Sequence, residues 1–452
     1  MRRLFVKANP AVSDANPARH HIFLRRDDGS EQQILFAGFS YYGEVAGLRA
    51  APADDFVELL PDTDPPNENW PAALSQPASN AVRMTYGQWM RFLSDHNVNQ
   101  SRLFCYPEVL CARYPIHRYR QGHPDPAKRN KYDLNIPNEV YLRALTRYIE
   151  LARRKGIVVQ ISFASWQALR NRANTDDWNA NPFNSETNIN LFIKASDGLS
   201  TFCNLNGHPN VLAAEKRYIE AIVNRTKPFW NVMYELFNEP IPGMTGVVDW
   251  HRQVATWVHD LLRDPSTGER SHLITFNAPA TLLDPALAGG SLLAKLLLDD
   301  AGRRLAVPLV DAYHFHGDQW GGVSGTKVCA NRPGVPSSPP TIRTATRNAV
   351  NGFYDRFIDA GHRLQVAGSR VAIVCDADAH SLAQDNPRVY AAAAFGLSLS
   401  YVHRWMNCYL QQGKLRSQAE GLRDVVHPRF SPPPDTGPSP IADVPALPID
   451  EE

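Results

Sequence analysis

Short apolar runs alternate with amphipathic segments along most of this chain, from about residue 34 to about residue 403. The runs predict buried strands, and segments with apolar residues three or four positions apart predict helices. Repeated strand–helix alternation is typical of a closed parallel barrel or of a doubly wound sheet. The predicted strands cover residues 34–40, 101–106, 157–163, 231–237, 272–277, 307–315, 370–376 and 397–403. The predicted helices cover residues 86–96, 138–155, 211–224, 247–262, 342–360 and 388–395.

The two ends of the chain depart from this repeat. Near the start, the dipeptide Asp28-Gly29 separates two short apolar runs, which predicts a β-hairpin. From Ser431 to Glu452 the chain is rich in proline and poor in apolar residues, which predicts an extended or disordered segment. A length of 452 residues suits one barrel with insertions. We therefore expect a single domain over residues 1–430 and a proline-rich tail over residues 431–452.

The composition excludes several classes of protein. Lysine and arginine number 47 against 46 aspartates and glutamates, a formal net charge of +1, which indicates neither a nucleic-acid partner nor an anionic membrane. No run approaches the roughly 20 apolar residues of a membrane span. The first residues lack the apolar core of a signal peptide, so we expect a cytoplasmic protein, or a secreted one if a signal was removed. No glycine-rich nucleotide fingerprint is present, and no cofactor is expected.

The fourth predicted strand ends in polar residues. Its apolar run, Val232 to Phe237, is followed directly by Asn238, Glu239 and Pro240. The proline fixes φ and lacks a backbone donor, so the strand stops there. In a barrel, the carboxyl ends of the strands face the active site. Glu239 is therefore a candidate catalytic acid, and polar residues at several strand ends favour the barrel over the doubly wound sheet.

Residues 234–240, Tyr-Glu-Leu-Phe-Asn-Glu-Pro, resemble the fourth-strand signature of the clan A glycoside hydrolases, which include the cellulase-like family 5 enzymes. Element order and spacing from about residue 20 to 425 also fit that clan. The resemblance implies an α/β fold, a (β/α)₈ TIM barrel whose bottom is plugged by the N-terminal hairpin and whose strands are followed by long loops. It also implies a retaining β-glycosidase in which Glu239 is the general acid/base and Asn238 contacts the sugar 2-hydroxyl.

The second catalytic carboxylate is where the sequence departs from the clan. The clan has a glutamate at the end of strand seven, whereas this chain has Asp376, with Asp378 on the same face if the strand continues. The shorter side chain withdraws the carboxylate by about 1.5 Å. The separation then grows from the about 5–5.5 Å of a retaining enzyme toward roughly 7 Å, which suits inversion. Three outcomes stay open: an aspartate attacks as nucleophile, the enzyme inverts with a water molecule, or the barrel binds glycans without cleaving them.

Arg102 lies on the second predicted strand, where the clan has an arginine that keeps the nucleophile ionised. A second role is equally open, because Arg102 can neutralise Glu235, which has the same strand parity as Glu239. The two roles are compatible. If the second holds, Arg102 and Glu235 should be buried partners inside the barrel.

Five further residues are candidates for sugar contacts. His314 and His316 share a face at the end of strand six, where the clan often has His-x-Tyr, and they can bind sugar hydroxyls or an aspartate. No third ligand accompanies them, so no metal is expected. Trp405 resembles the tryptophan that floors the subsite of the cleaved sugar, with core packing as the alternative. Trp166, in the long loop after strand three, and Tyr42, after strand one, can border the same cleft.

The sequence thus predicts a glycosidase acting on a β-linked oligosaccharide or polysaccharide such as a glucan or mannan. The alternative is a catalytically inactive glycan-binding barrel. An aldolase or a metal-dependent hydrolase is disfavoured, because neither a Schiff-base lysine at a strand end nor a set of metal ligands is evident. The sugar, the linkage, endo or exo cleavage and the oligomeric state do not follow from the sequence.

Overall fold

The structure is a computed structural model. It describes residues 2–8, 20–41, 57–60, 82–95, 97–104, 115–119, 121–165, 169, 178, 181–193, 201–240, 244–278, 282, 291–303, 305, 307–316, 371–377, 398–402 and 428–441.

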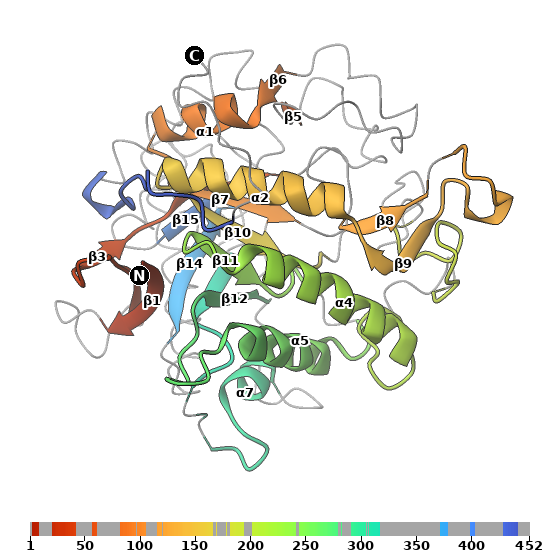
Figure 1. Cartoon of the computed structure of the whole chain (residues 1–452). Helices are drawn as coiled ribbons and strands as arrows, with labels where there is room; N and C mark the ends of the chain where they lie inside the picture. The colour runs from red at the N-terminus through yellow and green to blue at the C-terminus, as the bar shows by residue number, and fades with distance from the viewer. Residues whose placement is uncertain are drawn as a thin grey trace, which may run out of the picture.

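Eight parallel strands close into a barrel, which confirms the predicted (β/α)₈ fold and rules out the doubly wound sheet (Figure 1). The ring closes at β4, which pairs with both β7 and β15. Round the barrel, the strands are β4 (Ala37–Tyr41), β7 (Gln100–Phe104), β10 (Val158–Ser162), β11 (Val232–Glu235), β12 (Leu273–Asn277), β13 (Ala312–His316), β14 (Ala372–Ala377) and β15 (Ser398–Val402). Strand six was predicted from residue 307, but β13 begins only at Ala312.

Amphipathic helices cover the outside of the barrel. Figure 1 shows three of them, α2, α4 and α5, one below another beside the barrel strands. The helix predicted over residues 138–155 is confirmed in α2, which begins after Asn138. The Asn138 side chain accepts hydrogen bonds from the N–H groups of Val140 and Tyr141. It ends before Gly156, whose φ of +69° suits a helix C-terminus. The described α-helices are α1 (Tyr86–Asp95), α2 (Glu139–Arg154), α4 (Pro209–Thr226), α5 (Val247–Leu262) and α7 (Leu292–Leu297).

A three-stranded antiparallel sheet, which we call the plug, closes the N-terminal end of the barrel. It consists of β1 (Arg3–Ala8), β2 (His20–Arg25) and β3 (Glu31–Ile34), and β2 with β3 is the predicted hairpin. Apolar side chains of the plug and of the lower barrel interior form one buried cluster: Leu4, Ile22, Leu24, Ile34, Phe36, Val158, Met233, Leu273, Ala312, Ala372 and Val374. The hairpin therefore seals the barrel as expected, whereas β1 was not predicted.

Residues 428–441, which we call the C-terminal strap, lie against the same end of the barrel. The N–H of Leu35 donates to the carbonyl of Phe430 at 3.2 Å, and Asn99 Nδ2 donates to Ser431 Oγ at 3.0 Å. Arg153 Nη2 donates to a strap carbonyl at 2.7 Å. The described part of the proline-rich tail, residues 431–441, therefore has defined contacts with the barrel. A domain boundary at residue 430 stays a prediction.

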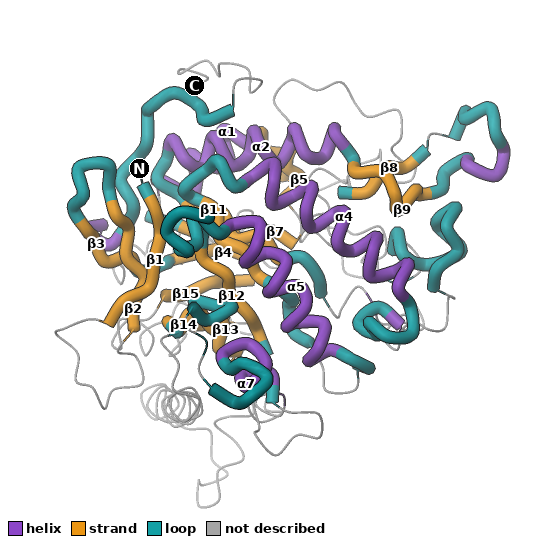
Figure 2. The backbone as a smooth tube through the Cα atoms, turned by 60° about the horizontal axis from the view of Figure 1, so that its bottom comes forward, coloured by secondary structure: helices purple, strands orange, loops and turns teal. Residues whose placement is uncertain are grey.

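Smaller elements accompany the barrel. A parallel pair is formed by β5 (Val57–Leu60) and β6 (Val82–Thr85). An antiparallel hairpin of β8 (Ile116–Arg118) and β9 (Tyr132–Pro137) stands at the opposite edge of the molecule from the plug (Figures 1 and 2). In the described part of the chain, no helix has the length and apolarity that crossing a membrane requires.

Candidate active site

A layer of polar side chains crosses the barrel above the apolar plug cluster. At its centre, Arg102 of β7 donates from Nε and Nη2 to the two carboxylate oxygens of Glu235 on β11, at 2.7 and 2.5 Å. Neither side chain is exposed to solvent. The buried pairing expected from strand parity is therefore present, in the bidentate geometry that suits a guanidinium and a carboxylate.

Glutamines extend this layer to neighbouring strands. Gln160 Nε2, on β10, donates to Glu235 Oε2 at 2.8 Å and contacts His314 Nε2 at 2.8 Å. Its oxygen accepts from Gln100 Nε2 at 2.6 Å. An amide nitrogen only donates, so His314 Nε2 is the acceptor in its contact. Together, these bonds satisfy a carboxylate and a guanidinium that would otherwise be costly to bury.

The same arginine fixes Asn238. Its Oδ1 accepts from Arg102 Nη2 at 2.7 Å, and its Nδ2 donates to Ser165 Oγ at 3.2 Å. The backbone N–H of Asn238 donates to the carbonyl of Ala164 at 2.6 Å, which extends the pairing of β10 with β11 beyond the strands themselves. Side chain and backbone are therefore both held at the carboxyl end of β11.

Glu239 follows in a strained conformation. Its φ is +52°, in the left-handed region, where a residue with a Cβ is disfavoured by about 1–2 kcal/mol. The residue is 8% exposed. Such strain persists when the surrounding contacts determine the backbone, and it is concentrated at functional sites. Here Asn238, anchored through its side chain and its backbone N–H, fixes the chain directly before Glu239.

The backbone of β14 places Asp376 opposite His316 on β13 and Ser400 on β15. It occupies the strand position two residues after Val374, which belongs to the interior cluster. The side chains of Asp376 and His316 are not described. Tyr42, Trp166, Asp378 and Trp405 lie outside the described residues, so their expected sugar contacts and the nucleophile role of Asp378 stay predictions.

Several polar residues of the site were not predicted. Gln100, Gln160 and Ser165 support the residues named above, and only Gln160 had a signal in the sequence, a polar residue within an apolar strand run. Asn277, the last residue of β12, has no exposed surface, and neither atom of its amide has a hydrogen-bond partner in the described structure. Thr275 Oγ1, two residues earlier, is also buried without a hydrogen-bond partner in the described structure. Such groups are costly when unpaired, so they mark a place where a further polar group fits.

Comparisons with known proteins concern the fold. No family model and no curated protein matches the sequence. Among solved structures, the lactosyl-enzyme intermediate of endo-glycoceramidase II from Rhodococcus sp. is 15% identical over 84% of this chain and 76% of that chain, with a TM-score of 0.46. An endo-1,4-β-mannanase from Rhizomucor miehei is 11% identical over 93% and 98%, with a TM-score of 0.47. A family 5 glycoside hydrolase from Prevotella bryantii is 13% identical over 85% and 99%, with a TM-score of 0.42.

Proposed function

We propose that the chain is a glycoside hydrolase that cleaves β-linked oligosaccharides or polysaccharides, with Glu239 as the general acid/base. The observation that carries the proposal is the anchoring of Asn238-Glu239 at the carboxyl end of β11. A buried ion pair and two further hydrogen bonds hold the asparagine, and the glutamate follows at a strained φ. A purely structural strand end needs neither feature.

The stagger of the barrel bears on the choice of the second carboxylate. Ladder pairs connect Ser162 on β10 through β11 and β12 to Ala312 on β13. Gln160 lies two residues before this level and His314 two residues after it, yet their side chains are 2.8 Å apart. Side chains that meet across three strand steps are therefore offset by four residues.

The same ladder runs from Glu235 on β11 to Ala372 on β14. Adding the offset of four residues to Ala372 leads to Asp376, which supports Asp376 as the residue across the barrel from Glu235. Arg102 then stands between two carboxylates. Both roles considered for this arginine, neutralising Glu235 and keeping the nucleophile ionised, hold at once in this proposal.

The chemistry follows from the two carboxylates. Glu239 donates its proton to the glycosidic oxygen while Asp376 attacks the anomeric carbon, so the bond to the leaving group breaks as the glycosyl-enzyme bond forms. Glu239, now ionised, then takes a proton from water, whose oxygen attacks the same carbon and releases Asp376. Asn238 is held where it can bind the sugar 2-hydroxyl during both steps.

The substitution Asp376→Glu tests the proposed separation between the two catalytic carboxylates. The nucleophile proposed here is one methylene shorter than a glutamate, which leaves its carboxylate about 1.5 Å further from Glu239. Asp376→Glu closes that gap toward the about 5–5.5 Å of a retaining pair. We expect this variant to hydrolyse aryl β-glycosides at least as fast as the parent.

The second candidate function is a glycan-binding barrel that does not cleave. The observation that favours it is the lack of a glutamate in the strand-seven sequence, residues 370–380. The two candidates differ in what the parent protein does. A silent barrel binds oligosaccharides without turnover, and its Asp376→Glu variant gains the activity that the parent lacks.

The decisive experiment is hydrolysis of a panel of 4-nitrophenyl β-glycosides by the parent and by Glu239→Gln. We expect the variant to lose about 10²–10⁴-fold in kcat. With azide, Glu239→Ala should yield a β-glycosyl azide and Asp376→Ala an α-glycosyl azide, because azide attacks the face that each variant leaves open. The control is Glu220→Gln, an exposed glutamate on α4. Turnover that Glu239→Gln leaves unchanged overturns the proposal.

A further inference from the structure

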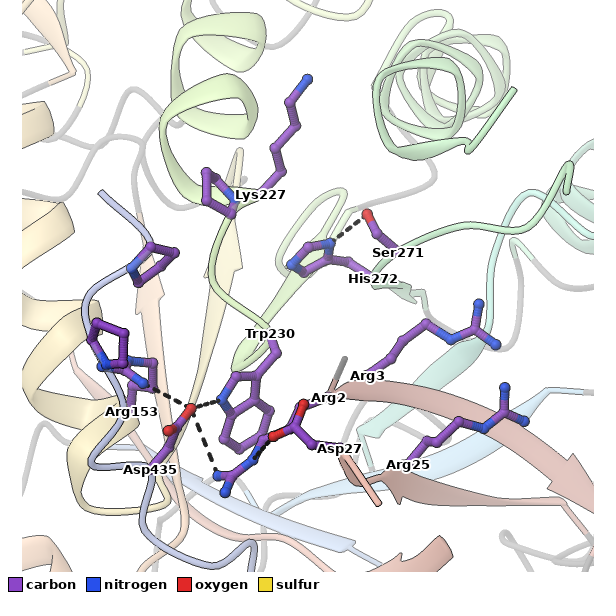
Figure 3. A pocket seen from close by; sticks show the side chains of 13 residues that line it. Arg2, Arg3, Arg25, Asp27, Arg153, Lys227, Trp230, Ser271, His272 and Asp435 are labelled. Carbon is purple, nitrogen blue, oxygen red and sulfur yellow. Dashed lines mark hydrogen bonds and ion pairs between the residues drawn. The ribbon is translucent and has the colours of Figure 1, made fainter. Parts of the chain in front are cut away.

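A cavity of about 410 Å³ lies at the N-terminal end of the barrel, opposite the candidate active site (Figure 3). The plug, the starts of β11 and β12, the ends of α2 and α4 and the C-terminal strap surround it. Its volume is in the range of small-molecule sites, about 300–1,000 Å³. Its charged lining consists of the cations Arg2, Arg3, Arg25, Arg153 and Lys227 and the carboxylates Asp27 and Asp435. Five cations against two carboxylates leave the lining net positive by three charges.

Two of the cations hold the strap in place. Arg153 donates to both oxygens of Glu150 at 2.9 Å and lies 2.8 Å from Asp435. Arg2 Nε donates to Asp27 Oδ2 at 3.2 Å, and its Nη1 lies 3.7 Å from Asp435. These charges are compensated within the wall of the cavity. Arg153 and Arg2 therefore have a structural role in holding the strap. Arg3, Arg25 and Lys227 make no hydrogen bond or ion pair with the strap in the described structure.

The remaining arginines form a like-charged pair. Arg3 on β1 and Arg25 on β2 are directly opposite each other in the antiparallel ladder, and in Figure 3 both side chains extend in the same direction. Like charges at directly opposite positions destabilise a strand pair. Their carboxylate partners, Glu269 at 2.5 Å and Glu31 at 3.0 Å, lie outside the cavity lining. Glu31 is also shared with Lys7.

The lining carboxylates Asp27 and Asp435 are paired with Arg2 and Arg153, and the described groups Lys227 and His272 add no negative charge to the cavity. Lys227 at the rim donates to Asn224 Oδ1 at 2.9 Å and contacts no carboxylate in the described structure. Burial lowers the pKa of His272 to about 4, so its ring is neutral. Its Nε2 donates to the carbonyl of Phe229 at 2.7 Å, which leaves Nδ1 to accept from Ser271 Oγ at 2.8 Å.

We propose that this cavity binds a phosphate-bearing small molecule, with the phosphate between Arg3 and Arg25. A guanidinium binds phosphate oxygens in a planar, bidentate manner, so one phosphate can bridge the pair and convert its repulsion into attraction. The cavity is larger than a phosphate alone, and the indole of Trp230 and three prolines supply an apolar surface for the uncharged part of the ligand. The proposal is independent of the glycosidase chemistry at the other end of the barrel.

The test is isothermal titration calorimetry of the full chain with three probes: inorganic phosphate, pyrophosphate and glucose 6-phosphate. Low, constant ionic strength set by chloride limits screening of the exposed cations. We expect saturable binding, tightest for glucose 6-phosphate, and a rise in Tm that saturates with the same ligand. Arg3→Gln and Arg25→Gln should each weaken binding by about tenfold or more, the loss of one charge-assisted hydrogen bond.

The matched control is Arg143→Gln, which removes the same charge from an exposed position on α2. Circular dichroism shows whether each variant is folded before it is titrated. The proposal is overturned if none of the three probes binds saturably, or if the control weakens binding as much as the cavity variants do. Inorganic phosphate binding as tightly as the ester overturns the assignment of the larger ligand.

Discussion

Replacing Glu235 with glutamine removes the negative charge of the buried pair, so Arg102 loses the carboxylate that it contacts in the described structure. Neither side chain is exposed, and the guanidinium donates two hydrogen bonds to the carboxylate at 2.7 and 2.5 Å. Breaking a buried ion pair from one side costs about 3–5 kcal/mol, because a charge remains desolvated. Glutamine keeps one acceptor oxygen, so we expect a loss of about 3 kcal/mol, more than a hundredfold in the ratio of folded to unfolded protein.

The measurement is urea denaturation followed by circular dichroism, with the free energy of unfolding obtained from the midpoint and slope. The matched control is Glu220→Gln, which removes a glutamate from an exposed pair with Lys216 at 3.7 Å and should cost less than about 0.5 kcal/mol. If Glu235→Gln costs no more than this control, the pair is not the desolvated charge cluster argued above. Replacing both partners, Arg102→Met with Glu235→Leu, should recover part of the stability and none of the turnover, because Asn238 loses its donor.

Three further predictions test the strap and two buried titratable groups. Gly156→Ala should destabilise the fold by about 1–2 kcal/mol more than Gly302→Ala in urea denaturation, because both have positive φ but only the first would place a Cβ 2.2 Å from a strap carbonyl. Burial raises the pKa of Glu215 well above its usual range, so the unfolded chain releases a proton that the folded state retains, and stability falls as pH rises above about 4.5. Glu215→Gln should therefore raise the urea midpoint relative to the parent at pH 8 and lose this advantage near pH 5. Burial lowers the pKa of His272 to about 4, so stability should fall by up to about 3 kcal/mol between pH 6.5 and pH 4, and His272→Gln should remove that share of the acid sensitivity.

The barrel strands were predictable because parallel strands buried on both faces are nearly continuous apolar runs. Failures occurred where local chemistry overrides that pattern. The run from residue 307 includes Pro308, and the Asp311 carboxylate accepts hydrogen bonds from the N–H of Ile274 and from Arg270, so β13 begins only after it. The plug strand β1, RLFVKA, lies at the edge of its sheet and mixes basic with apolar residues. It therefore lacks the continuous apolar run that would predict a strand.

Contacts within the site were predictable where it was enough to know which residues of each strand point into the barrel. They were unpredictable where the contact depends on the stagger between strands. Arg102 and Glu235 share the interior parity of their strands, so their pairing was one of the two roles predicted for the arginine. The contact of Gln160 with His314 depends on an offset of four residues across three strand steps, which no single run of sequence contains. The basic cavity is harder still, because segments from residue 2 to residue 440 contribute to it.

The two ends of this barrel carry unfavourable features of different kinds, and the contrast supports the functional assignments. At the carboxyl ends of the strands, Glu239 adopts a strained φ, and the buried amide of Asn277 has no hydrogen-bond partner among the described residues. Each feature has a cost that a substrate or catalytic group can offset. At the amino ends, an apolar plug, a strap and compensated ion pairs serve stability, as is usual for this face of a barrel. The cross-strand pair of Arg3 and Arg25 is the exception at that face, because the carboxylate partners of the two arginines, Glu269 and Glu31, lie outside the cavity that both guanidinium groups line. An anion bound between the two guanidinium groups, as proposed above, would lower their mutual repulsion on the side that faces the cavity.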